Sequence, residues 1–348
     1  MTYYLLPQGN INLSNCFQLE LSLKNVSPNI LSPSLTNYLF QIMAQTKTET
    51  YFKLQNEIHP YSNMMQTSPY TEHYFEIIEI MQTMHLNKYL DSITKNIPLR
   101  ILSFENNSGI EAIQSIRGKK DLYIRPNHQK NVELDISIFE EAYLGYAANV
   151  NVILADSTKY AHMQSVIIEL CMCLCVQNKK GVLIWKIGDC FTQIMLETLY
   201  FISSFYEKTY IIKPSIMDVS KPERYVICKG FLCDKCYSNY TYLLPLVKQL
   251  NFHLYQNPFE IPFVHSFLQK KIPQFFIGKL EEVNYILGQS QLEQIHYMLL
   301  LLSHKYKEDK KNNITKQNEQ KCLDWKRKHR YFAPILSIPV QQIQTAWV

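Results

Sequence analysis

The chain has 348 residues, of which 47% are hydrophobic and 19% are charged. These proportions exclude a disordered chain and provide enough apolar residues for a large core. The formal net charge of +5 is compatible with a nucleic-acid partner but does not indicate one.

Apolar runs, the N-terminal stretch and the cysteines bear on location. No apolar run reaches the roughly 18 residues of a membrane-spanning helix, and the stretch MTYYLLPQGN lacks the basic and apolar regions of a secretory signal. The nine cysteines are odd in number and lack the spacing of a disulfide framework. We therefore expect reduced thiols, a cytoplasmic protein and no membrane partner.

Residues 1–95 are predicted to form an N-terminal extension. Residues 35–45 favour a helix. The stretch YTEHYFEIIEIMQTMHLNKYL, which begins at Tyr70, repeats apolar residues at helical spacing. We interpret it as one amphipathic helix.

Residues 96–232 alternate between short apolar runs and helical patterns. The predicted strands cover residues 99–104, 121–125, 151–155 and 182–186. The predicted helices cover residues 109–116, 137–145, 162–177 and 191–205. Strands that alternate with helices are typical of an α/β fold with a mostly parallel sheet and helices on both faces. Two last strands, 209–213 and 225–229, are expected to form an antiparallel hairpin at one edge.

Residues 233–348 are predicted to form a helical C-terminal region, with helices at 242–255 and 280–305. Residues 305–330 contain ten Lys or Arg against four acids. This basic stretch either follows the phosphates of RNA or forms a solvated helix face. The same helical region also offers a surface for a protein partner.

Two opposite charges stand at the ends of predicted strands. Lys186 ends the apolar run in GVLIWKIGDCF, and Asp156 follows NVILA. Ligands of open α/β sheets bind beyond the carboxyl ends of the strands, so both side chains are candidates for one crevice. The alternatives are a solvent-facing strand end for Lys186 and a helix N-cap for Asp156.

The order of these segments resembles the FtsJ-like ribose 2′-O-methyltransferase family, in the branch that methylates mRNA caps. The resemblance covers roughly residues 48–232. It rests on ETYFKLQNEI, DLYIRPN, NVILAD, and the run from GVLIWKIGDCF through IIKPS to ERYVICKG. It implies a Rossmann-like methyltransferase core, S-adenosylmethionine as the cofactor, and RNA, including capped mRNA, as the partner.

The resemblance also implies a catalytic tetrad of Lys53, Asp156, Lys186 and Glu223. A ribose hydroxyl is a weak nucleophile near neutral pH, and a lysine accepts its proton only when the lysine is neutral. Lys186 is the implied general base, Lys53 and Glu223 orient it and the hydroxyl, and Asp156 lies near the methyl donor. Neighbouring cations and partial burial lower the pKa of a lysine, whereas carboxylates oppose that shift.

The stretch RILSFENNSGIEAI stands where the family has a glycine-rich loop that approaches the cofactor. The expected cofactor-binding residues are Ser103, Glu105, Asn107, Gly109, Asp121 and Asp156. Because the stretch has one glycine and no proline, side chains project where the family's backbone approaches S-adenosylmethionine. Two functions stay open: ribose 2′-O-methylation of RNA, of the mRNA cap type, and an inactive methyltransferase-like subunit for RNA binding or assembly.

Two further patterns are weaker. Cys228, Cys233 and Cys236 lie in CKGFLCDKC, but a zinc site normally requires a second Cys or His pair, so we expect no metal. Aromatic side chains of the C-terminal region either stack on bases or pack in the core, and core packing is favoured; they are Tyr237, Tyr240, Tyr242, Trp325, Tyr331 and Phe332.

Overall fold

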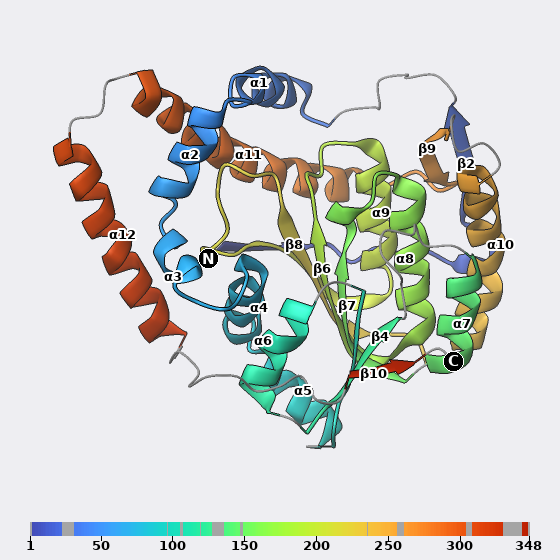
Figure 1. Ribbon diagram of the computed structural model, residues 1–348. Coiled ribbons are helices and arrows are strands. Elements are labelled where there is room, and N and C mark those ends of the chain that lie inside the picture. Colours follow the sequence, from blue (N-terminus) through green and yellow to red (C-terminus); the bar gives the residue numbers. More distant parts are fainter. Residues whose placement is uncertain are drawn as a thin grey trace.

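An eight-stranded sheet forms the centre of the computed structural model (Figure 1). The structure describes residues 2–22, 31–95, 97–104, 107–118, 120–126, 136–146, 149–234, 236–255, 261–303, 308–329 and 343–346. The strand order is β1-β7-β8-β6-β5-β3-β4-β10. The strands are β1 (Thr2–Leu6), β3 (Arg100–Ser103), β4 (Leu122–Pro126), β5 (Val150–Asp156), β6 (Gln177–Ile187), β7 (Tyr206–Lys213), β8 (Arg224–Phe231) and β10 (Ile343–Ala346).

The sheet is mostly parallel, as the alternation of strands and helices predicts. Strands β6, β5, β3, β4 and β10 run parallel to their neighbours in this series. Strand β8 is antiparallel to both β6 and β7, and β1 is antiparallel to β7. Strand β4 lies on one side of β3, and β5 and β6 lie on the other side. The strand order therefore reverses between β3 and β5.

Helices cover both faces of the sheet because successive apolar residues of the central strands point to opposite faces. Ile153 of β5 packs into one core cluster and Leu154 into the other. The first face is covered by α7 (Ile136–Tyr146), α8 (Met163–Val176), α9 (Gln193–Ser203) and α10 (Cys236–Tyr255). The second face is covered by α4 (Glu72–Thr83), α5 (Leu86–Thr94) and α6 (Asn107–Arg117).

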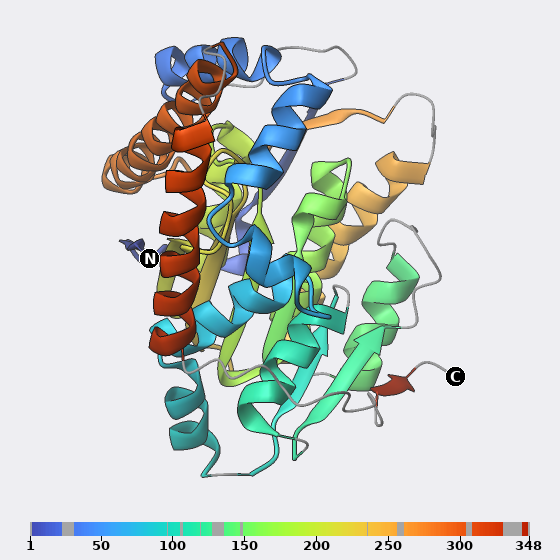
Figure 2. The ribbon, with the colours of Figure 1, turned by 60° about the vertical axis from the view of Figure 1, so that its left-hand side comes forward.

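The remaining elements surround one end of the sheet. Helix α1 (Pro33–Ala44) packs on α11 (Gln274–Ser303), and α2 (Glu49–Ile58) contacts α11 and α12 (Glu308–Lys328). Helix α3 (Ser62–Gln66) follows α2, and β2 (Phe17–Ser22) pairs with β9 (Phe263–Leu268) in a separate antiparallel ribbon. Figure 2 shows α12 along the outside of the molecule. Among the described helices, none has the length and apolar character needed to cross a membrane.

The structure departs from the predicted elements at several points. The helix expected from Tyr70 onward is two helices, α4 and α5, because His85 between them has a φ of 51°. The strands 209–213 and 225–229 pair as expected, but β8 lies between β6 and β7, and β1 forms the edge. Strand β9 lies within the region expected to be helical. The predicted zones 1–95, 96–232 and 233–348 each contribute strands to one sheet.

Candidate functional site

Asp156 and Lys186 lie side by side at the carboxyl edge of the sheet. Asp156 ends β5, Lys186 is the penultimate residue of β6, and the two residues are direct partners in the parallel pairing of these strands. Because paired residues project to the same face, both side chains point to the face covered by α4. The sequence predicted that these two side chains lie close together, because each stands at the end of a predicted strand, and their pairing agrees with this.

Lys186 is held by a buried network on α4. Its ammonium lies 2.8 Å from Oε2 of Glu76, and the Glu76 side chain is 1% exposed. The Tyr225 hydroxyl donates to the same carboxylate oxygen at 2.6 Å and lies 2.6 Å from Nδ1 of His73. Nδ1 of His73 is itself 3.2 Å from Oε2 of Glu76. Glu76 therefore accepts from three side chains at a buried position.

The pKa shifts of this pair follow from burial and charge. Burial alone would raise the pKa of Glu76, but the His73 hydrogen bond and the Lys186 charge outweigh it and lower the pKa to about 2. Burial would lower the pKa of Lys186, but the charge and hydrogen bond of Glu76 raise it overall. Both partners are therefore charged near neutral pH, and the Lys186 ammonium has no lone pair for a substrate proton.

Asp156 has a local structural partner. Its Oδ1 accepts from the backbone N–H of Thr158 at 2.9 Å and from the Thr158 hydroxyl at 2.5 Å. It thereby caps the short 3-10 helix η2 (Ser157–Lys159). The alternative role expected for Asp156 was a helix N-cap, and the structure has this cap at a 3-10 helix. Burial lowers the pKa of Lys186, but the Glu76 charge and, after it, the Asp156 charge raise it.

Glu223 lies one strand further along the same edge. It immediately precedes β8, whose first residue, Arg224, pairs with Ile187 at the end of β6. Oε2 of Glu223 is buried and has no hydrogen-bond partner among the described residues. Its backbone carbonyl accepts from Nζ of Lys213 at 2.7 Å. Burial, followed by the Arg224 charge, lowers the pKa of Lys213 to about 7.

Lys53 has a partner outside this group. It lies on α2, where its ammonium pairs with Glu49 at 2.7 Å, and its side chain is 70% exposed. Within the described part of the chain, Lys53 has no other ion pair. Helix α2 itself lies close to the edge, because Gln55 donates to Asp218 at 2.6 Å and to Ser220 at 2.9 Å. The structure thus brings Asp156, Lys186 and Glu223 to one edge and gives Lys53 a different partner.

Three of the residues expected to bind the cofactor lie between β3 and α6, beside the switch point. Ser103 ends β3 and is buried, whereas Asn107 and Gly109 lie in the first turns of α6. Asn107 accepts a hydrogen bond from Arg125. Glu105 lies outside the described residues.

The switch point is bridged by the chain itself. The backbone N–H of Phe104 donates to the carbonyl of Leu154 at 2.9 Å, and its side chain is buried in the core. The ammonium of Lys159 donates to the Phe104 carbonyl and lies 3.3 Å from Glu169. A cationic side chain therefore lies across the strand ends where the sequence predicts the methyl donor.

Asp121 lies at the opposite edge of the sheet. It precedes β4, so it is at the amino end of a parallel strand. Its carboxylate pairs with Arg117 at 2.5 Å and accepts from the backbone N–H of Leu99 at 3.0 Å. Arg117 also pairs with Asp91 at 2.9 Å. This buried cluster lies at the amino edge, on the opposite side of the sheet from the strand ends of Asp156 and Lys186.

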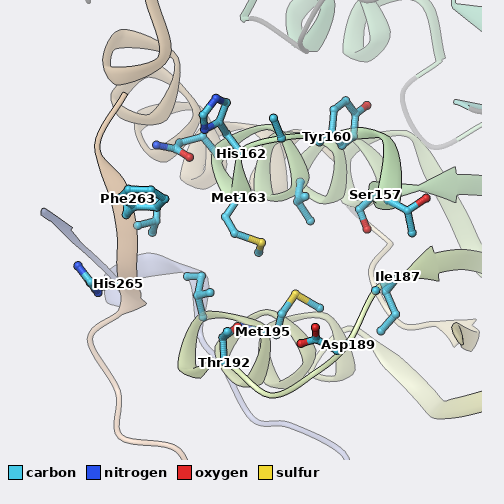
Figure 3. Close-up of a pocket in the computed structure, with 17 residues that line it drawn as sticks. Ser157, Tyr160, His162, Met163, Ile187, Asp189, Thr192, Met195, Phe263 and His265 are labelled. Carbon is cyan, nitrogen blue, oxygen red and sulfur yellow. The ribbon is translucent and has the colours of Figure 1, made fainter. Parts of the chain in front are cut away.

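A cavity of about 620 Å³ opens at the carboxyl ends of β5 and β6, on the face covered by α8 and α9 (Figure 3). The sulfur atoms of Met163 and Met195 point into it from these two helices. Asp189, Ser157 and Ile187 form its inner end. Sequence reasoning missed this cavity, and the polar run STKYAHMQ after Asp156 was the available signal.

The structure describes some of the residues in the two weaker sequence patterns. No group of three or more His, Cys, Asp or Glu with metal-site geometry occurs among the described residues. The Cys236 and Tyr237 side chains, Tyr331 and Phe332 lie outside those residues. Trp325 is buried, with its indole N–H 2.9 Å from Glu79, and Tyr240 stacks on Tyr143. Tyr242 is exposed.

Comparisons with known proteins identify no family. No family matches the sequence, and no curated protein matches it. Among solved structures, one match is a structure of MppP soaked with the product 2-ketoarginine, at 8% identity and a TM-score of 0.21. That match covers 85% of this chain and 73% of the other. A similarity this weak indicates neither a shared fold nor a shared function.

We predict that Asp121 is a structural residue. Asp121→Ala removes the buried carboxylate that pairs with the buried Arg117, so the free energy of unfolding should fall by about 3–5 kcal/mol. Urea denaturation measures the change. The matched control is Asp324→Ala, which removes an exposed pair with Arg327 at 3.8 Å and should cost less than about 1 kcal/mol. Equal effects of the two substitutions would contradict the structural role.

We predict an acid-sensitive contribution from Glu76. Its pKa is about 2 in the folded protein, below the ordinary value of 4.5, so its stabilising effect is present above pH 4.5 and is lost as the pH falls from 4.5 towards 2. The shift corresponds to about 3 kcal/mol. Denaturation curves between pH 2 and pH 7 should show this loss in the native chain and a flatter profile in Glu76→Gln. Parallel profiles would contradict it.

Proposed function

We propose that this chain is a methyltransferase-like protein that binds RNA without transferring a methyl group. One observation carries the proposal: the Lys186 ammonium is paired with the buried carboxylate of Glu76 at 2.8 Å. The pKa of Lys186 is raised, so the side chain keeps its proton near neutral pH. A protonated lysine does not accept the proton of a ribose hydroxyl.

The sheet supports a methyltransferase-like core. Open α/β sheets bind ligands at the carboxyl ends of the strands where strand order reverses, here between β3 and β5. The mostly parallel strands and the helices on both faces fit the Rossmann-like core that the resemblance implies. The FtsJ-like sequence resemblance covers these segments.

Three further contacts support the absence of methyl transfer. Lys53 pairs with Glu49 at the surface, and Asp156 caps Thr158. Lys159 bridges the switch point to the Phe104 carbonyl. Catalysis requires that the reacting groups be held within hydrogen-bond reach of the substrate, and in this chain these groups are already engaged elsewhere.

RNA binding is supported by the resemblance and by two surface features. The 620 Å³ cavity lies within the size range of small-ligand sites, and its two methionines adapt readily to a flat ring. Lys326, Arg327 and Lys328 form the last turn of α12. Such a cluster at the end of a helix attracts phosphates.

A second candidate is an active S-adenosylmethionine-dependent ribose 2′-O-methyltransferase. It is favoured by the unpartnered Oε2 of Glu223 at the same edge as Asp156 and Lys186. In this candidate, substrate binding would have to separate Lys186 from Glu76 before the lysine acts as a base.

Calorimetric titration separates the two candidates. We expect no heat of binding with millimolar S-adenosylmethionine or S-adenosylhomocysteine, and no methyl transfer to capped RNA. Lys186→Ala should lower the free energy of unfolding by about 3–5 kcal/mol, because it removes the ammonium partner of the buried Glu76 carboxylate. Cofactor binding and turnover in the native chain, with turnover lost in Lys186→Ala, would establish the enzyme instead.

RNA binding should depend on the last turn of α12. Replacement of Lys326, Arg327 and Lys328 by Glu should weaken binding of single-stranded RNA and reduce the slope of log affinity against log salt by about 2. Fluorescence anisotropy over a salt series measures both quantities. The control makes the same charge change at the exposed residues Lys47, Lys208 and Lys248. Equal losses in the two variants would argue against a binding site on α12.

A further inference from the structure

The N-terminal strand β1 forms one edge of the sheet, and no strand among the described residues pairs with its outer side. It pairs with β7 on one side, and the strand order ends at β1. Figure 2 shows the N-terminus at the rim of the molecule. Natural edge strands are usually protected by charges, proline, bulges or a covering element. The sequence of β1, TYYLL, contains neither a charge nor a proline.

The exposed side chains of β1 are apolar and lie on one face. Tyr3 is 53% exposed and Leu5 is 50% exposed. Because they are two residues apart, they project to the same side. An antiparallel pair of identical strands centred on Tyr4 would place Tyr3 of each copy opposite Leu5 of the other. Aromatic and aliphatic side chains in such opposed positions stabilise a pair of strands.

Helix α11 presents a matching seam on the other face of the edge. It contacts β1. Lys279 and Glu282 of α11 form an ion pair at 2.8 Å within one chain. Phe275, Lys279, Glu282 and Ile286 follow each other at helical spacing and therefore share one side of α11. Phe275 is 63% exposed and Ile286 is 39% exposed.

This seam is complementary to itself when reversed. In an antiparallel pair of α11 helices centred between Lys279 and Glu282, each Phe275 faces Ile286 of the other copy, and each Lys279 faces Glu282. Apolar groups then meet apolar groups, and cations meet anions. Because α11 contacts β1, one twofold axis can relate both the two helices and the two strands. An isologous dimer requires such a shared axis.

We propose that two copies of this chain form a twofold dimer through β1 and the Phe275–Ile286 side of α11. The two sheets join at β1 into one continuous sheet, with the paired α11 helices on one face and the Tyr3–Leu5 pairs on the other. The proposal does not depend on the proposed RNA-binding function.

Charge exchange in the full chain tests the helix seam. Sedimentation equilibrium should give about twice the monomer mass of 41.1 kDa. Lys279→Glu places two acids opposite each other and should shift the protein towards monomer. The double variant Lys279→Glu, Glu282→Lys keeps the intrachain pair and restores opposite charges across the axis, so it should recover the dimer. Glu293→Lys, an exposed change further along α11, is the control and should leave the mass unchanged.

A cysteine scan tests the register of the strands. Residues on the axis face their own copies at about 4.5–5.5 Å between Cα atoms, a separation that permits a disulfide. Tyr4→Cys should therefore cross-link the dimer under mild oxidation. Tyr3→Cys, which faces Leu5 of the other copy, should cross-link far less. Monomeric native protein at every concentration, or a dimer that Lys279→Glu leaves intact and Tyr4→Cys does not cross-link, would overturn the proposal.

Discussion

Two buried carboxylates on α4 hold the carboxyl edge of the sheet together. Glu76 accepts from Lys186 and Tyr225, which lie on β6 and β8. Glu79, one turn later, accepts from the backbone N–H and the hydroxyl of Ser215, both at 2.8 Å, and from the indole of Trp325. A buried charge is tolerated only when it is paired and hydrogen-bonded. The position of α4 therefore determines how β6, the segment after β7 and α12 meet.

This arrangement has a consequence for chemistry at the edge. A lysine that completes a buried ion pair contributes to stability because it stays charged. A lysine that acts as a general base must give up its proton near the working pH. Lys186 satisfies the first condition through Glu76. Lys213, whose pKa is about 7, is nearer to the second, but its ammonium donates to the backbone carbonyls of Lys221 and Glu223.

The Lys186–Glu76 ion pair and the cavity lie on opposite faces of the sheet. Lys186 points towards α4, whereas its neighbours Trp185 and Ile187 belong to the core on the opposite face. The cavity between α8 and α9 opens on that opposite face, next to Ile187. Strand alternation thus separates the ion pair from the cavity although both lie at the same edge. A ligand in the cavity would contact Met163 and Met195 without disturbing Glu76.

Sequence reasoning predicted most of the central fold because its signals are local. Apolar runs such as NVILA and helical spacing such as that of residues 162–177 correspond to β5 and α8. The neighbouring position of Asp156 and Lys186 followed from the same pattern, since consecutive parallel strands end at one edge. The same pattern places Asp121 at the amino edge, because Asp121 is the first residue of the predicted strand 121–125.

Local patterns in the sequence thus indicate the kinds of elements and the charges that stand at strand ends. The partners of the buried charges depend on how the elements pack together. Glu76 has the sequence position of an ordinary polar residue on an amphipathic helix, but every residue from His73 to Met81 is buried in the fold. The Lys53–Glu49 pair is local, four residues apart on α2, but the Glu76–Lys186 pair and the pairing of β1 with β7 join distant segments. These two long-range contacts depend on packing, which local periodicity does not encode.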